Sequence, residues 1–172
     1  MDFQKVRSVS CTDTSFPSKI PTATEPTGDG GTAGSASIVE LGQGNIATQN
    51  KIIVTPYGLG DDNDVFAMRI IGWRKIGTGS TALWIPVTLA ELTCTMCAVV
   101  GVVGQTILDT EHFCDTLVLV TGNDDVSIDI VSPANDTLAH AVLDVKGFRK
   151  IEVCFDMTTG NPTSGNCLYA PY

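Results

Sequence analysis

The chain has 172 residues, of which 43% are hydrophobic and only 17% charged, and its formal net charge is −9. This acidic balance argues against nucleic-acid binding, which needs clustered lysines and arginines to displace phosphate counterions, and against docking on an anionic membrane surface. The length predicts one domain, and the low charge content favours a surface that partners cover.

Residues 1–34 are predicted to form an extended N-terminal arm, and residues 35–172 a β-rich domain. The arm is rich in Ser, Thr, Pro and Gly, and Pro17, Pro21 and Pro26 disfavour a helix. Because fixing one backbone residue costs roughly 1–2 kcal/mol, an ordered arm needs a surface to lie on. That surface is either a partner or, as for many terminal strands, the arm's own domain.

The domain is predicted to begin with strands at Ser37–Leu41 and Lys51–Val54, which lead into an apolar block at Asp64–Gly104. Within that block, Val65–Lys75 is apolar at most odd and even positions. A strand of this kind is covered on both of its faces, by a second sheet, a neighbouring subunit, or one on each side.

Two more strands are predicted inside the apolar block, at Leu83–Val87 and Leu92–Ala98. Pro86 lacks an N–H group, so it predicts a sheet edge or a bulge. The apolar run Cys94–Val103 is about half the roughly 20 residues that a membrane span needs, and it is interpreted as a buried strand.

Four strands are expected in the remaining chain, at Asp115–Val120, Val126–Val131, Ala139–Val145 and Lys150–Asp156. The chain then has about nine short strands and no convincing helix. This pattern predicts an all-β fold, a β-sandwich or barrel, with the jelly roll among its forms.

The six cysteines are expected to be reduced and buried. Met1–Lys5 lacks the apolar core of a signal peptide, which favours synthesis in a cytosol. Cys94 and Cys97 match Cys-x-x-Cys, but positions i and i+3 of a strand point to opposite faces. A structural role is therefore favoured over a metal or redox site.

No catalytic residue, metal site or cofactor is predicted, and the chain is not expected to be an enzyme. Gly60–Asp64 has the oxygen density of a calcium loop without the spacing of an EF-hand, which favours a solvated turn. His112 and His140 are the only histidines, and no nucleophile elbow, phosphate loop or dinucleotide fingerprint accompanies them.

Trp73 and Trp84 flank the Gly77–Gly79 loop and are expected to meet across a hairpin. Core packing is the favoured interpretation of this pair, and a sugar-binding pair is the alternative.

Several stretches resemble the small capsid decoration, or cement, proteins of tailed bacteriophages. The resemblance covers about residues 36–170 and is one of pattern and composition. It rests on Arg69-Ile70-Ile71-Gly72-Trp73-Arg74, Leu83-Trp84-Ile85-Pro86, Ala98-Val99-Val100-Gly101, and the closing Gly147, Ile151, Phe155-Asp156 and Asn166-Cys167-Leu168-Tyr169.

The resemblance implies a structural virion protein on the capsid exterior, made in the host cytoplasm. Such proteins are β-rich, often trimeric, and bind the outer surface of the major capsid protein shell across subunit boundaries, often through an extended terminal arm. No nucleic-acid or membrane partner is expected. The arm residues expected to contact the shell are Phe3, Phe16, Pro17, Pro21 and Pro26.

Two other functions stay open from the sequence. One is a receptor- or glycan-binding β-sandwich, such as the head of a phage fibre or spike, although no coiled-coil heptad precedes the domain. The other is a hydrolytic jelly-roll enzyme, which would need two or more carboxylates or histidines converging in a cleft.

Overall fold

The computed structural model describes residues 4–9, 19–26, 37–40, 50–98, 111–132, 138–157, 162 and 164–171. Within them the chain forms ten strands and a single 3-10 turn at Gly79–Thr81, and all strand pairs are antiparallel. The strands are β1 Gln4–Val9, β2 Ser37–Glu40, β3 Lys51–Leu59, β4 Val65–Ile76, β5 Leu83–Met96, β6 Glu111–Gly122, β7 Ile128–Val131, β8 His140–Asp144, β9 Lys150–Asp156 and β10 Ser164–Pro171.

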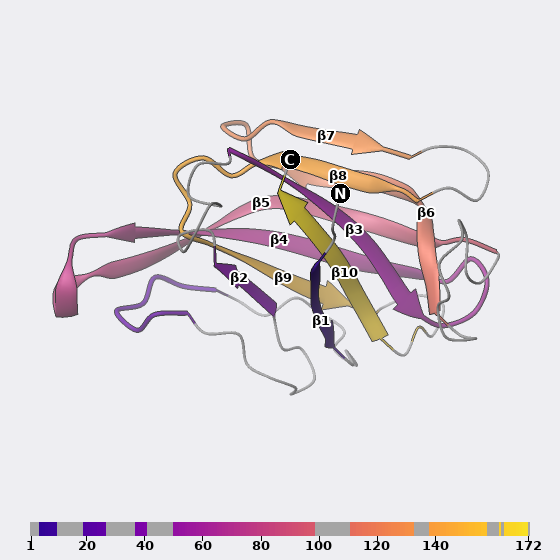
Figure 1. Ribbon diagram of the computed structural model, residues 1–172, viewed down its shortest axis with the longest axis horizontal. Coiled ribbons are helices and arrows are strands. Elements are labelled where there is room, and N and C mark those ends of the chain that lie inside the picture. The colour runs from indigo at the N-terminus through magenta and orange to yellow at the C-terminus, as the bar shows by residue number, and fades with distance from the viewer. Residues whose placement is uncertain are drawn as a thin grey trace.

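The strands form one open, hydrogen-bonded array that is folded into two layers (Figure 1). The first layer has the order β1-β10-β3-β8-β7, and the second has the order β6-β5-β4-β9-β2. β6 joins them, because Glu111–Phe113 pairs with β3 whereas Cys114–Gly122 pairs with β5. The predicted all-β sandwich is confirmed.

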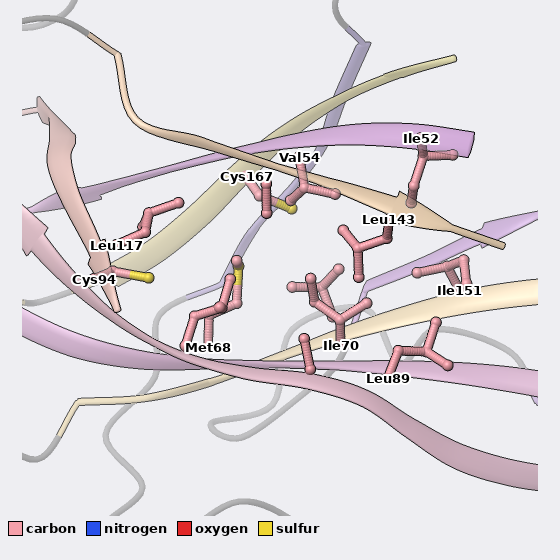
Figure 2. Close-up of a cluster of buried hydrophobic side chains, with 14 of the residues drawn as sticks. Ile52, Val54, Met68, Ile70, Leu89, Cys94, Leu117, Leu143, Ile151 and Cys167 are labelled. Carbon is pink, nitrogen blue, oxygen red and sulfur yellow. The ribbon is translucent and has the colours of Figure 1, made fainter. Parts of the chain in front are cut away.

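Side chains from both layers meet in one core (Figure 2). Ile52, Val54, Leu143 and Cys167 come from the first layer. Met68, Ile70, Leu89 and Ile151 face them from the second layer, and all eight are almost fully buried. Burying one such aliphatic side chain stabilises the fold by roughly 1.5–3 kcal/mol, so this interior holds the layers together.

β5 is one strand where the sequence predicted two, and a bulge explains the difference. Val87 and Leu89 face the core at odd positions, whereas Ala90, Leu92 and Cys94 face it at even positions. The pairing with β4 shifts register here, and Leu89 is the extra residue between Thr88 and Ala90. A bulge reverses which alternate positions face inward, so the apolar pattern changes phase within one strand.

The other predicted strands agree with the structure, apart from their ends, and two strands were not predicted. β1 lies within the predicted arm, and β10 lies in the C-terminal tail; these two strands pair with each other. The predicted edge at Pro86 is confirmed, because β6 pairs with β5 only over Ala90–Met96. β9 lies beside β4 after the long excursion through β7 and β8, which gives the Greek-key order β9-β4-β5-β6.

Gly72 leaves room for an aromatic ring at the sheet surface. A Cβ atom at this position would clash with Cδ1 of Phe148, whose ring is buried. The Arg74 guanidinium lies over the same ring, 4.7 Å from its centroid. The ring therefore cannot move aside freely, and a larger residue at position 72 strains the packing.

We expect Gly72→Ala to lower the free energy of unfolding by about 1–3 kcal/mol in a urea titration. In a Phe148→Ala background, Gly72→Ala should no longer lower the free energy of unfolding. It could even raise it by about 0.5–1 kcal/mol, because glycine weakens a strand interior. Equal costs in both backgrounds would show that Phe148 is not the cause.

Candidate functional site

A second apolar cluster lies on the outer face of the second layer. It consists of Ile71, Trp73, Trp84 and Cys154, all buried, from β4, β5 and β9. Ile70 faces the main core and its neighbour Ile71 faces this cluster, as alternate strand residues do. The prediction that β4 is covered on both faces is confirmed, and Trp73 and Trp84 belong to a packed cluster as favoured.

Part of the cover is the segment Lys19–Pro26, here called the strap. The Thr22 N–H donates to the Trp84 carbonyl over 2.9 Å, and the Trp84 N–H donates to the Thr22 carbonyl over 2.8 Å. In an antiparallel ladder the next such pair would join Ile20 to Pro86, which has no N–H to donate. Pro86 therefore stops the pairing of the strap with β5 from continuing toward Ile20.

A buried carboxylate ties the strap to β9. Glu152 Oε1 lies 2.7 Å from Lys19 Nζ, and its Oε2 accepts the Trp73 indole N–H over 2.6 Å. The Glu152 side chain is only 4% exposed, whereas that of Lys19 is 27% exposed. A buried carboxylate needs such partners, because each unpaired charge costs several kcal/mol.

A buried lysine on the same strand holds the other end of the strap. Lys150 Nζ lies 2.7 Å from Glu25 Oε1 and donates to the Pro26 carbonyl over 3.0 Å. It also lies 5.4 Å from the centroid of the Trp84 ring, within cation–π range. The hydrogen bond and charge of Lys150 hold the pKa of Glu25 below its ordinary value.

The strap and the residues that hold it are here called the strap site, and this site pairs opposite charges crosswise. The strap carries a cation at Lys19 and an anion at Glu25, and β9 carries an anion at Glu152 and a cation at Lys150. Together with the Thr22 bridge, these pairs favour a segment with a cation at one end and an anion at the other, bound in one direction. The site binds an extended segment of its own chain, and the charged groups named above are all used in that contact.

The predicted shell-contact residues fall in three places. Phe3, Phe16 and Pro17 lie outside the described residues. Pro21 is exposed, and Pro26 is half-buried with its carbonyl bound to Lys150. Their contact with a shell stays a prediction. Sequence reasoning missed Lys19, Glu25, Lys150 and Glu152, although alternate charges within the otherwise apolar Lys150–Asp156 were a signal that this face has partners.

The cysteines within the described chain are free and buried, as expected, and Cys11 lies outside it. Burial, together with the hydrogen bond that its S–H donates to Cys94, raises the pKa of the Cys114 thiol, and burial raises the pKa of the Cys167 thiol as well. Such thiols are poor nucleophiles. No group of three or more His, Cys, Asp or Glu suited to a metal occurs among the residues that the structure describes.

The acidic turn and His112 form a structural corner. Asp64 is buried, and its Oδ2 accepts the Asp61 N–H over 2.8 Å, which closes the turn. Nδ1 of the buried His112 lies 2.9 Å from the Cys97 carbonyl and 3.7 Å from Asp62 Oδ1. His140 lies elsewhere, on β8, with its Nδ1 3.4 Å from the Leu138 carbonyl.

Comparison of the chain with protein-family models, curated proteins and solved structures gives no match. In the described part of the chain, no helix is long and apolar enough to cross a membrane. A functional proposal therefore rests on the strap site and on the exposed apolar residues.

We expect Lys19→Met to open the strap more often, because Glu152 would keep only the Trp73 N–H as a partner. Hydrogen exchange of the Trp84 amide, which donates to the strap, should accelerate about tenfold or more, in line with about 1–3 kcal/mol for a hydrogen bond to a charged group. The exposed Lys146→Met is the matched control and should leave this exchange unchanged. Adding Glu152→Gln to Lys19→Met should restore part of the protection, since the amide has no charge to compensate.

The strap should also loosen in acid. Glu25 has a lowered pKa in the folded protein, so its contribution is present above the ordinary glutamate pKa and is lost as pH falls through the lowered value. Both tryptophans lie in the strap site, so their emission reports on it. The emission of wild type and Glu25→Gln should differ at pH 7 and converge only below the lowered pKa of Glu25. A difference that persists unchanged into strong acid would contradict the role of Glu25.

Proposed function

We propose that this chain is a structural virion protein, a capsid decoration or cement protein of a tailed bacteriophage. It binds the outer surface of the major capsid protein shell and stabilises that shell across subunit boundaries. Contacts that exist only with the assembled shell stabilise it by mass action. The resemblance described above motivates this function, and one structural observation carries it.

That observation is the presence of two separate exposed apolar surfaces. One is the tip of the β4–β5 hairpin, with Ile76 and Leu83, at the far left of Figure 1. The other is on β6 and β7, with Val118–Val120 and Val131. Leu119 pairs with Leu92, nine residues along β5 from Leu83, so the surfaces lie about 30 Å apart at roughly 3.3 Å per residue.

Separate apolar surfaces suit a protein that joins neighbours. Exposed apolar patches mark interaction sites, and a protein that bridges two subunits needs a contact at each end. The arm was expected to contact the shell, but its described parts have another position. Its strap and β1 lie on the chain's own domain, so a shell contact through those residues would require them to leave it. The hairpin tip is therefore the first candidate for the shell contact.

The glycan-binding alternative gains no support from the tryptophan pair. Trp73 and Trp84 are buried in the strap site, so neither ring face is open for stacking on a sugar. A fibre or spike head remains an outcome that the experiment below can detect.

The test is to remove the gene from the phage that carries it and to add the purified protein back to the particles. We expect saturable binding to the capsids and recovery of resistance to heating, which dye access to the packaged DNA measures. The variant Ile76→Lys/Leu83→Lys should weaken binding at least about tenfold, and Lys146→Met is the control on an exposed site away from the tip. Gold labelling confined to the tail would instead support the fibre-head function, and absence of the protein from purified particles would exclude both.

A further inference from the structure

The tip of the β4–β5 hairpin projects beyond the sheet that carries it (Figure 1). On one side, β9 pairs with β4 only as far as Trp73. On the other side, β6 pairs with β5 only from Ala90 onward. Among the described strands, only β4 and β5 contribute to the last three pairs, which join Arg74–Ile76 to Leu83–Ile85. This end of the hairpin is a two-stranded ribbon.

A two-stranded ribbon has little rigidity of its own. Such ribbons twist more than wider sheets, and a hairpin without a third strand is only marginally stable in water. Ile76 and Leu83 form the last pair of the ribbon, and they are exposed and not packed in the core. The orientation of the tip therefore depends on what supports the ribbon.

The strap supplies such a support. Thr22 exchanges two backbone hydrogen bonds with Trp84, over 2.9 and 2.8 Å, and Trp84 pairs with Lys75 of β4. The next pair along the hairpin is the tip pair, Ile76 with Leu83. Thr22 thus acts as a third strand one pair away from the tip, at an edge of β5 where none of the named strands pairs.

The strap is itself fixed on β9, on the far side of β4. Lys19 pairs with Glu152 and Glu25 pairs with Lys150, each over 2.7 Å. Because β4 lies between β9 and β5, the strap crosses β4 to reach Trp84 and then returns. Glu152 and Lys150 are buried, so water does not readily replace the strap at these anchors. The strap therefore ties the free edge of the ribbon to a buried strand.

We propose that the strap holds the hairpin tip in one orientation and thereby regulates the contact of the tip with the shell. The regulation rests on the proposed function, whereas the orientation of the tip does not. When the strap opens, the ribbon adopts several orientations, and only the fraction that matches the partner can bind. The arm then contributes to the shell contact without touching the shell.

This role has a kinetic signature. Loss of the strap should lower the association rate in proportion to the fraction of tips in the matching orientation. The dissociation rate should stay unchanged, because the contacts of a bound tip are intact. Loss of a tip side chain should instead raise the dissociation rate, as interface substitutions usually do. The two rates therefore distinguish an element that positions the tip from a residue that touches the shell.

The first measurement needs no capsid. Spin labels at Ser80→Cys in the tip and at Asp125→Cys in the turn before β7 report the distance between the tip and the rest of the domain. Cys11→Ser is present in every protein, because the other five native thiols are buried. The intact strap should give one narrow distance distribution. Thr22→Pro removes the N–H that donates to Trp84 and should broaden the distribution at least about twofold, whereas Thr22→Ala keeps that N–H.

Lys19→Met covers the case in which Thr22→Pro fails to fold. It should broaden the distribution as well, because Glu152 loses its charged partner on the strap, and Lys19→Arg should restore the narrow distribution. A narrow distribution in Lys19→Met and in folded Thr22→Pro would overturn the proposal. Equal broadening by Thr22→Pro and Thr22→Ala would overturn it too, because the backbone hydrogen bond would then not be the cause.

The second measurement is the rate of binding to capsids that lack the protein. Thr22→Pro should lower the association rate at least about threefold and leave the dissociation rate unchanged, whereas Ile76→Lys/Leu83→Lys should raise the dissociation rate. A broadened tip with an unchanged association rate would overturn the regulation of the contact. Wild type that does not bind capsids would overturn the proposed function, and the distance measurement would still decide whether the strap holds the tip.

Discussion

The two-sided burial of β4 is the constraint on which the structure depends. Met68 and Ile70 face the core between the layers, and Ile71 and Trp73 face outward and are buried as well. A second sheet can cover only one of these faces. The other has to be covered from elsewhere in the chain, and the strap supplies part of this cover at Trp84. The position of residues 19–26 thus depends on the composition of β4, a strand that begins 39 residues further along the chain.

The strap is held mainly by polar contacts, although it lies on an apolar cluster. Thr22 contributes the two backbone hydrogen bonds, and Lys19 and Glu25 pair with two charges of β9 that are themselves buried. Burying Glu152 and Lys150 is costly, so their pairing adds less to stability than the short distances suggest. It adds selectivity, because a segment without this charge pattern would not supply the opposite charges that Lys19 and Glu25 bring to these two groups. A contact of this kind fixes where the arm binds without binding it irreversibly.

The sequence predicts those parts of the fold that depend on local pattern. β9 was placed at its observed bounds, because Ile151, Val153 and Phe155 alternate along one face and Gly147 breaks the preceding strand. β1 and β10 were missed because their pairing joins the two ends of the chain, and neither segment has a clear apolar alternation. The two halves of β5 were predicted as two separate strands, because the bulge at Leu89 reverses which alternate positions face inward. The strap site was missed for a related reason. Its charged residues lie far apart in the sequence, and only the fold brings the strap beside β9.

The distribution of charge connects the fold with assembly. The strap site uses two lysines of a chain that has only ten lysines and arginines, and Arg69 pairs with Glu91 nearby. The remaining surface is acidic, and it disfavours contact between copies wherever carboxylates gather. The hairpin tip has no carboxylate between Lys75 and Leu83, and β6 has none between Thr116 and its end at Gly122. Like-charge repulsion therefore opposes the approach of an acidic partner least at these two stretches, so charge and apolar exposure favour the same places for a contact.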